Sequence, residues 1–394
     1  MPETTIPRGT FSRMDAIQAP IVAVIGDLIR QTPGTISLGQ GIVHYGPPSE
    51  VARAVEAALS SPDTHQYNDG HGLPELRSAI KAKLRDENGI EVGGDSRIMV
   101  TAGANMAFMH AVMAITTPGD EVILPIPFYF NHEMAIQMAG CRAVRVATDD
   151  RYQLDLDGIE RAITNRTRAV VTISPNNPSG AVLDPASLRA VNELCRARGL
   201  YHIADEPYEY FTYGSARHFS PHSLPGAANH TISMYSLSKA YGFASWRIGY
   251  MVVPESLAVA VNKIQDTMLI CAPHVSQAAA IGALRAGRAY CDRHVVTLAG
   301  VRARVLERLS AVDDLCEVPT AAGAFYCLLR IRTPMDAMTL AERLIREHGV
   351  ATVPGTTFGL TEACYLRVSY GALAADTVDE GVGRLVGGLK GIVG

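Results

Sequence analysis

The sequence lacks an excess of either charge and has few aromatic residues. Its 394 residues include 35 Lys and Arg against 39 Asp and Glu, a formal net charge of −4, and a single Trp. Proteins that bind nucleic acid or membrane surfaces through charge carry a clustered basic patch, which this near-balance does not provide. The sequence therefore predicts no nucleic acid and no membrane as a partner, and it favours small molecules as ligands.

The sequence also lacks the cysteine spacing of a metal site or a disulfide framework. It contains no CxxC pair and no close group of Cys and His. Because an odd, scattered set is typical of reduced thiols, we expect a cytoplasmic protein with mostly buried, free cysteines and no bound metal. The first twenty residues hold prolines and charges where a signal peptide needs a continuous apolar stretch. The cysteines are Cys141, Cys195, Cys271, Cys291, Cys316, Cys327 and Cys364.

Long uninterrupted hydrophobic runs are scarce as well. Residues 98–119 contain no Asp, Glu, Lys or Arg and approach the length of a membrane span. Gly103, Asn105, His110 and Pro118 interrupt this run. We therefore expect a strand, a turn and a buried helix there in place of a membrane helix.

What the sequence does contain is a regular alternation of short apolar runs and helix-period segments. Apolar or β-branched runs at 97–103, 121–127 and 168–175 are each followed by a helical pattern. Strands separated by helices of this length predict an α/β domain of three layers, with a mostly parallel sheet between two layers of helices. The helical pattern at 185–199 ends in a basic turn and a glycine, which is a stop signal.

The pattern changes after about residue 278. A long helical pattern leads into apolar strands at 325–331 and 365–370, with a helical pattern at 337–349 between them. Length also favours two domains, because 394 residues exceed what one hydrophobic core usually carries. We expect a smaller α+β domain, and we divide the chain into an N-terminal arm with part of the small domain (1–50), a large domain (51–284) and a C-terminal small domain (285–394).

Five short polar segments follow the apolar runs, where the ligands of such sheets gather beyond the carboxyl ends of the strands. Each segment alone is a weak signal, since a lone lysine is far more often a solvated surface charge than a catalytic group. Their order along the chain is the informative feature. The segments are 101–105, 125–129, 174–180, 204–208 and 236–242.

The last of these segments begins the stretch SLSKAYGFASWRIGY at 236–250. It resembles the lysine signature of pyridoxal-phosphate-dependent aminotransferases of fold type I, classes I and II. The resemblance runs from LGQG at 38–41 to LRVSY at 366–370, which is nearly the whole chain. It implies the α/β fold with a smaller domain, pyridoxal 5'-phosphate as the cofactor, and transfer of an amino group between an L-amino acid and a 2-oxo acid. A lyase, a cyclase or an oxidase on the same scaffold is the alternative, because the pocket selects among the reactions that this cofactor supports.

The resemblance implies three catalytic residues. Lys239 matches the lysine that bonds to the cofactor aldehyde and moves the proton of the substrate α-carbon. Such an amine must be available unprotonated, which burial beside the cationic Arg247 would favour. We expect Lys239, Arg247 and Arg367 all to be buried. Asp205 matches the carboxylate that pairs with the ring nitrogen, while Tyr208 and Asn177 match the groups that hydrogen-bond the ring oxygen. Without the resemblance, Asp205 could cap a turn and Tyr208 could be a core aromatic.

The start of one predicted helix has the features of an anion site. Gly103, Ala104 and Asn105 open this helix, whose free N–H groups and dipole attract a phosphate dianion. By the resemblance, Arg247 binds the same phosphate through its planar guanidinium. Two hydroxyl side chains complete this set by the resemblance, Ser236 and Ser238.

Two tyrosines complete the cofactor site that the resemblance implies. Tyr129 matches the aromatic residue that stacks on the cofactor ring, although its neighbours Phe128 and Phe130 leave a plain core role open for all three. Tyr67 matches a tyrosine that reaches the phosphate of the neighbouring subunit's cofactor. If Tyr67 acts in this way, each site is built from two chains, and a homodimer is the minimal working unit.

Arg367 matches the arginine that holds the substrate α-carboxylate, with Gly41 and Asn177 beside it. Fixing that carboxylate leaves the bond to the α-hydrogen free to stand perpendicular to the cofactor ring. Ile42 and its apolar neighbours favour aromatic, methionine or other apolar amino acids over dicarboxylates. Aspartate stays open as a substrate, because Arg217 or an arginine of the partner chain could bind a second carboxylate. Structural roles are expected for the nearby histidines His44, His65, His71 and His132.

Overall fold

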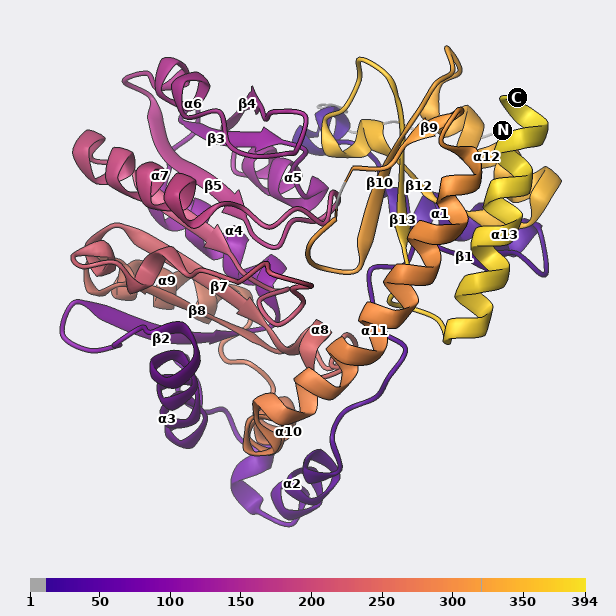
Figure 1. Ribbon diagram of the computed structural model, residues 1–394. Coiled ribbons are helices and arrows are strands. Elements are labelled where there is room, and N and C mark those ends of the chain that lie inside the picture. Colours follow the sequence, from indigo (N-terminus) through magenta and orange to yellow (C-terminus); the bar gives the residue numbers. More distant parts are fainter. Residues whose placement is uncertain (1–11, 320) are drawn as a thin grey trace, which may run out of the picture.

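The structure, a computed structural model, describes residues 12–319 and 321–394. Its centre is a seven-stranded sheet in the order β2-β8-β7-β6-β5-β3-β4 (Figure 1). Strands β3 to β7 run parallel to one another, whereas β8 runs antiparallel to β2 and β7. The mostly parallel sheet predicted from the sequence is confirmed. The strands are β2 Ser96–Thr101, β3 Glu121–Ile126, β4 Arg142–Ala147, β5 Thr167–Ile173, β6 Tyr201–Asp205, β7 Thr231–Ser236 and β8 Gly249–Pro254.

Helices cover both faces of this sheet. In β3, Val122 and Leu124 are buried in one cluster with side chains of α4, α5 and α9, whereas Ile123 between them is buried with side chains of α6 and α7. Because successive strand residues point to opposite faces, a strand that is apolar at every position needs cover on both sides. The result is the predicted three-layer arrangement. The covering helices are α4 Ala104–Ile115, α5 Phe130–Met138, α6 Leu156–Ala162, α7 Pro185–Arg198 and α9 Glu255–Met268.

Helix α7 shows how local sequence signals set a helix boundary. The Asp184 side chain accepts a hydrogen bond from the N–H of Ala186 at its start, with Pro185 as the first helical residue. At its end, Gly199 has a φ of 65°, the left-handed conformation that glycine adopts without steric cost. The predicted stop after the basic turn is confirmed.

A second, antiparallel sheet has the order β12-β13-β10-β9 and packs with the C-terminal helices (Figure 1). The N-terminal segment joins this part, because β1 pairs in parallel with β11 and α1 packs against α12. These elements are α1 Ile21–Gln31, β1 Ile36–Ser37, α11 Arg288–Leu309, β9 Cys316–Glu317, β10 Tyr326–Ile331, α12 Ala337–His348, β11 Val350–Ala351, β12 Val353–Pro354, β13 Cys364–Ser369 and α13 Ala375–Ile392.

The long helix α11 follows α10 and extends from it towards the second sheet, where it packs against α13 (Figure 1). Helix α10 packs closely against α2 and α3. The domain limits at 50 and 284 stay a prediction, and the first eleven residues of the expected N-terminal arm lie outside the described residues. The remaining helices are α2 Ser49–Leu59, α3 Pro74–Lys83, α8 Leu237–Ala240 and α10 His274–Ala286.

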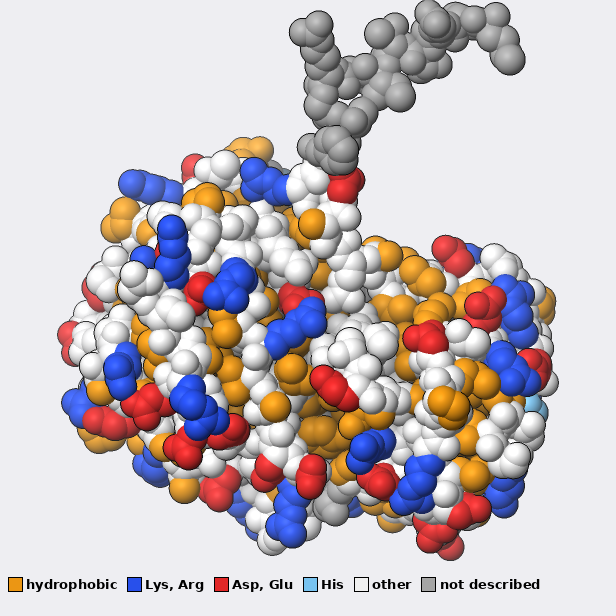
Figure 2. All heavy atoms as spheres, turned by 90° about the horizontal axis from the view of Figure 1, so that it is seen from above, with side chains coloured by type: hydrophobic (Ala, Val, Ile, Leu, Met, Phe, Trp, Pro, Cys, Tyr) orange, Lys and Arg blue, Asp and Glu red, His pale blue; other side chains and the backbone are white. Residues whose placement is uncertain are grey.

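The distribution of surface charge and the state of the cysteines match what the sequence predicts. Acidic and basic side chains are interspersed on the face that Figure 2 shows. All seven cysteines are buried and free, as the sequence predicts. Residues 98–119 form β2, a turn and α4, and no helix within the described part of the chain has the length and apolarity to cross a membrane.

Candidate active site

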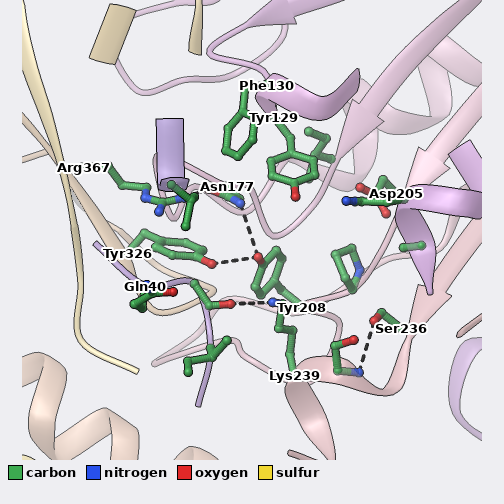
Figure 3. A pocket seen from close by; sticks show the side chains of 18 of the residues that line it. Gln40, Tyr129, Phe130, Asn177, Asp205, Tyr208, Ser236, Lys239, Tyr326 and Arg367 are labelled. Carbon is green, nitrogen blue, oxygen red and sulfur yellow. Dashed lines mark hydrogen bonds between the residues drawn. The ribbon is translucent and has the colours of Figure 1, made fainter. Parts of the chain in front are cut away.

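A pocket lies beyond the carboxyl ends of β5, β6 and β7, where β10 and β13 of the small sheet meet them (Figure 3). This is the place where parallel α/β sheets bind ligands. The pocket brings together almost all the residues singled out in the sequence. These are Gly41, Ala104, Asn105, Tyr129, Asn177, Asp205, Tyr208, Ser236, Ser238, Lys239, Arg247 and Arg367.

Lys239 lies on the short helix α8, which starts directly after β7. The Ser236 side chain caps this helix by accepting a hydrogen bond from the N–H of Ser238 at 3.1 Å. The Nζ of Lys239 donates a hydrogen bond to the carbonyl oxygen of Gly41. Burial of the amine, and then the positive charges of Arg367 and Arg247, lower the pKa of Lys239 to about 8. About a tenth of this amine is therefore unprotonated at pH 7, far more than for an ordinary lysine.

Asp205 ends β6 and is 4% exposed. Its Oδ2 lies 3.1 Å from Nε2 of His132, a buried residue of α5 that stacks on Phe108. Its Oδ1 has no hydrogen-bond partner among the described residues. A buried carboxylate oxygen without a partner is costly, so this atom is suited to a cationic N–H donor of a ligand. Sequence reasoning gave His132 a structural role and missed this contact.

Tyr208, on the loop after β6, is fully enclosed by side chains from distant parts of the chain. Its hydroxyl accepts a hydrogen bond from Nδ2 of Asn177 at 3.4 Å and lies 2.8 Å from the hydroxyl of Tyr326. Burial raises the pKa of Tyr208 well above its usual value. The phenol therefore stays protonated, and it keeps a proton that it can donate. Tyr326 did not figure in the sequence reasoning.

Arg367 projects from β13 and is 2% exposed. Its guanidinium donates to Oδ1 of Asn177 at 2.8 Å and to the carbonyl oxygen of Gly39 at 2.6 Å. Among the described residues no carboxylate pairs with it, and its Nε has no partner. A buried cation without a counter-ion provides a binding site for an anionic group of a ligand.

The opposite end of the pocket is built around the start of α4. Gly103 caps this helix with a φ of 86°, and a Cβ at that position would collide with the guanidinium of Arg247. Arg247 itself is exposed, which differs from the burial we expected, because its guanidinium lies at the surface, where it donates to the carbonyl oxygens of Ala244 and Ala102. The helix N-terminus, the guanidinium and the Ser236 and Ser238 side chains together suit a phosphate.

Aromatic and apolar side chains close the remaining walls. Tyr129 tilts against Phe130, with 4.8 Å between the ring centroids, and its hydroxyl accepts a hydrogen bond from Asn131. Stacking of Tyr129 on a ligand ring stays a prediction. Several lining residues were not given site roles from the sequence. Nothing in the local pattern marks Val22 and Ile173, whereas Gln40 and Pro207 lie within segments singled out there for other residues.

Two residues considered from the sequence lie away from this pocket. Tyr67 is 81% exposed and borders a shallow surface depression near Leu59 and Pro273. Its role towards a neighbouring subunit stays a prediction. Arg217 donates hydrogen bonds to the carbonyl oxygens of Gly214 and Ala216 and does not line the pocket.

Known proteins resemble this chain over nearly its whole length. Residues 33–385 match the family model of aminotransferase class I and II. The chain is 33% identical over 380 residues to the aromatic aminotransferase ISS1 of Arabidopsis thaliana, covering 94% of each chain. It is 32% identical over 380 residues to the aspartate aminotransferase of Pyrococcus abyssi, covering 95% of this chain and 96% of that one. A solved structure of Thermus thermophilus aspartate aminotransferase with maleate superposes with a TM-score of 0.89 at 31% identity, over 97% of this chain and all of that one.

Proposed function

Because the chain belongs to the aminotransferase class I and II family, we propose that it binds pyridoxal 5'-phosphate in this pocket through Lys239. We propose further that it transfers the amino group of an aromatic or other apolar L-amino acid to a 2-oxo acid. The observation that carries the proposal is that Lys239, Asp205, Arg247 and Arg367 line one pocket, where burial and the two arginines lower the pKa of the Lys239 amine to about 8. Lys239 suits the aldehyde of that cofactor, Asp205 suits its ring nitrogen, and Arg247 suits its phosphate.

The residues present fit the cofactor at three points. The unpaired Oδ1 of Asp205 suits the protonated ring nitrogen, and Tyr208 can donate its proton to the ring oxygen. The start of α4 and Arg247 suit the phosphate. Bound in this way, the cofactor would supply an aldehyde for the lysine and an electron-withdrawing ring beside the substrate α-carbon.

Lys239 and Arg367 would act on different groups of the substrate, the α-proton and the α-carboxylate. Arg367 binds the α-carboxylate, because its buried guanidinium has no acidic partner among the described residues. Asn177, which accepts from Arg367 and donates to Tyr208, keeps that guanidinium next to the ring oxygen site. The Nζ of Lys239 then takes the α-proton and holds it for return, which its pKa of about 8 allows near neutral pH.

The lining residues favour an apolar substrate side chain. Val22, Ile42 and Phe130 line the pocket, and burying an aromatic or aliphatic group against them is favourable. The cations among the described lining residues are Lys239, Arg247 and Arg367, and each already has a role above. A second substrate carboxylate would need another cation. The relatives named aspartate aminotransferases keep that alternative open, with a second copy of the chain as the source of the cation.

A homodimer with shared sites is part of the proposal. Tyr67 is an 81% exposed tyrosine beside the apolar side chains of Leu59 and Leu269, an arrangement suited to contact with a second copy. Mixing the inactive Lys239→Ala variant with a Tyr67→Ala variant tests this directly. If the sites are shared, hybrid dimers contain one intact site, and about a quarter of all sites regain activity. No gain of activity on mixing would contradict shared sites.

We also propose a cytoplasmic location, which the free thiols of all seven cysteines support. Fractionation of cells, followed by detection of the chain, tests this point. Recovery of the chain with the membranes or outside the cell would overturn it.

The enzymatic proposal is tested by loading the protein with cofactor and screening amino acids together with 2-oxo acid acceptors. We expect phenylalanine, tyrosine or methionine to yield its 2-oxo acid and to convert the acceptor to an amino acid. Efficient use of aspartate with poor use of phenylalanine would favour the alternative substrate class. Release of a leaving group, a ring product or peroxide without amino exchange would favour a lyase, a cyclase or an oxidase.

A further inference from the structure

Tyr326 is a fully buried tyrosine at the start of β10 whose hydroxyl points into the pocket (Figure 3). The pairing of β10 with β13 sets Tyr326 opposite Ser369 and Leu328 opposite Arg367. Since Ser369 and Arg367 are two residues apart on one strand, Tyr326 and Arg367 lie on the same face of the sheet as diagonal neighbours. The guanidinium of Arg367 lies 4.7 Å from the centre of the Tyr326 ring.

The hydrogen bonds around Tyr208 restrict which hydroxyl donates to which. Oδ1 of Asn177 accepts from Arg367, so the amide nitrogen of Asn177 faces Tyr208 and can only donate. If Tyr326 also donates to Tyr208, the oxygen of Tyr208 accepts twice and its own proton is free to point elsewhere. In the reverse order Tyr208 would donate its proton to Tyr326, and the proton of Tyr326 would be the free one. The first order suits the proposed function, because it leaves Tyr208, the residue matched to the ring oxygen, with a proton to donate.

Gly41 limits the freedom of the Tyr326 hydroxyl. A Cβ added at Gly41 would lie 2.6 Å from the Tyr326 oxygen, so the backbone of Gly41 packs directly over that hydroxyl. The carbonyl oxygen of Gly41 accepts from Lys239. Tyr326 thus contacts three parts of the site at once, the hydroxyl of Tyr208, the guanidinium of Arg367 and the backbone that holds Lys239.

We propose that Tyr326 is a positioning residue, whose hydroxyl donates to Tyr208 and thereby directs the proton of Tyr208 into the pocket, towards the ring oxygen of the cofactor. Its ring separately stabilises the guanidinium of Arg367 through a cation–π contact. This inference rests on the proposed function, since it concerns how the chain's own hydroxyls meet the cofactor. It assigns a role to a side chain 118 residues away from Tyr208 in the sequence.

The test is a visible pH titration of cofactor-loaded Tyr326→Phe. In the loaded protein, the lysine-bound cofactor would lose a proton beside its ring oxygen as the pH rises, and this loss would change the absorbance. A proton donated by Tyr208 to that oxygen favours this loss, so weakening the donation raises the pH midpoint. We expect an upward shift of about half to one pH unit, the size of one neutral hydrogen bond. The matched control is Tyr213→Phe, which removes a buried hydroxyl bonded to Ala324 and should leave the midpoint unchanged.

A double variant shows whether Tyr326 shifts the pH midpoint through Tyr208 or by disturbing the pocket in general. In the Tyr208→Phe background, adding Tyr326→Phe should produce no further shift, because the acceptor of its hydrogen bond is gone. A shift of equal size in both backgrounds, or no shift of Tyr326→Phe alone, would overturn the inference. Failure of Tyr326→Phe to take up the cofactor would also count against it, because Lys239 and the phosphate end are unchanged.

The role of the ring is tested with Tyr326→Leu against Tyr326→Phe. The phenylalanine keeps the ring beneath Arg367, so the KM for amino acids should stay close to the original value while kcat falls. The leucine removes the ring, and KM should rise several-fold beyond that of the phenylalanine variant. Equal KM values for both variants would overturn this part. If the unsubstituted protein shows no absorbance of a lysine-bound cofactor, the proposed function itself fails, which is a distinct outcome.

Discussion

At one end of the pocket, Gly103, Ala104 and Asn105 are consecutive residues at the start of α4. At the other end, Asn177 and Arg367 meet across 190 residues, and Tyr208 and Tyr326 across 118. The first end offers backbone N–H groups, which any sequence of the right local shape provides. The second end depends on side chains from both sheets. The comparison teaches that the backbone part of the phosphate site is a local property, to which Arg247 adds a cation from the turn before β8 of the same sheet. Carboxylate binding, in contrast, depends on how the small sheet packs against the large one.

Of these substitutions, Lys239→Ala should have the largest effect on activity. It removes the covalent attachment and the base together, and we expect activity to fall by roughly a thousandfold or more. The readout is turnover with saturating cofactor. Lys263→Ala, at an exposed position of α9, is the matched control and should keep full activity.

Arg367→Ala should affect the non-local end alone. Removing a buried cation that binds the substrate carboxylate should raise the KM for amino acids and for 2-oxo acids roughly a hundredfold. Cofactor affinity should change little, because Arg247 and α4 remain. Arg330→Ala, an exposed position of the neighbouring strand, serves as the control. Loss of cofactor affinity comparable to the loss of substrate binding would contradict the separation of the two ends.

Cofactor capture by the protein should depend on pH through Lys239. Only the unprotonated amine attacks an aldehyde, and its pKa is about 8. The capture rate should therefore rise about tenfold between pH 7 and pH 9 and then level off. Arg367→Gln removes a cation that lowers this pKa, so the midpoint should move upward. Stopped-flow absorbance measures both, and a rate that is flat from pH 6 to pH 9 would argue against the lowered pKa.

Gly103→Ala should have the smallest effect and should be confined to the local end. The added Cβ meets the Arg247 guanidinium at a positive φ, so cofactor affinity should fall about fivefold or more while the KM for amino acids stays the same. Gly94→Ala has a similarly positive φ but nothing within 4 Å of its Cβ. This control carries the backbone strain without the collision, and it should lower thermal stability while leaving cofactor affinity unchanged.

The local features of the molecule could be predicted from the sequence. The alternation of apolar runs and helical patterns predicts the central sheet, and the stop signal at Gly199 matches the end of α7. The order of the polar segments identifies Lys239, Asp205 and the start of α4, because each lies at or just after the end of a strand of one sheet. Parallel strands carry their C-terminal residues to a common edge, so such residues meet without any long-range information.

The non-local contacts could not be predicted in the same way. Tyr326 lies within an apolar run that gives only a strand pattern, and its partner Tyr208 lies on a loop after a strand of the other sheet. His132 lies on a buried helix, and nothing near it in the sequence points to Asp205. Burial of Arg247 was predicted wrongly, since sequence pattern does not reveal where a pocket opens to solvent. These three residues depend on how distant elements pack.

The most direct test of the account is to locate the covalent attachment of the cofactor. The protein is loaded with pyridoxal 5'-phosphate, reduced with borohydride to fix the bond, digested, and analysed by mass spectrometry. The account predicts that the added mass lies on the peptide containing Lys239 and disappears in Lys239→Ala. Attachment at another lysine, such as the buried Lys83, or no attachment in loaded protein would contradict it.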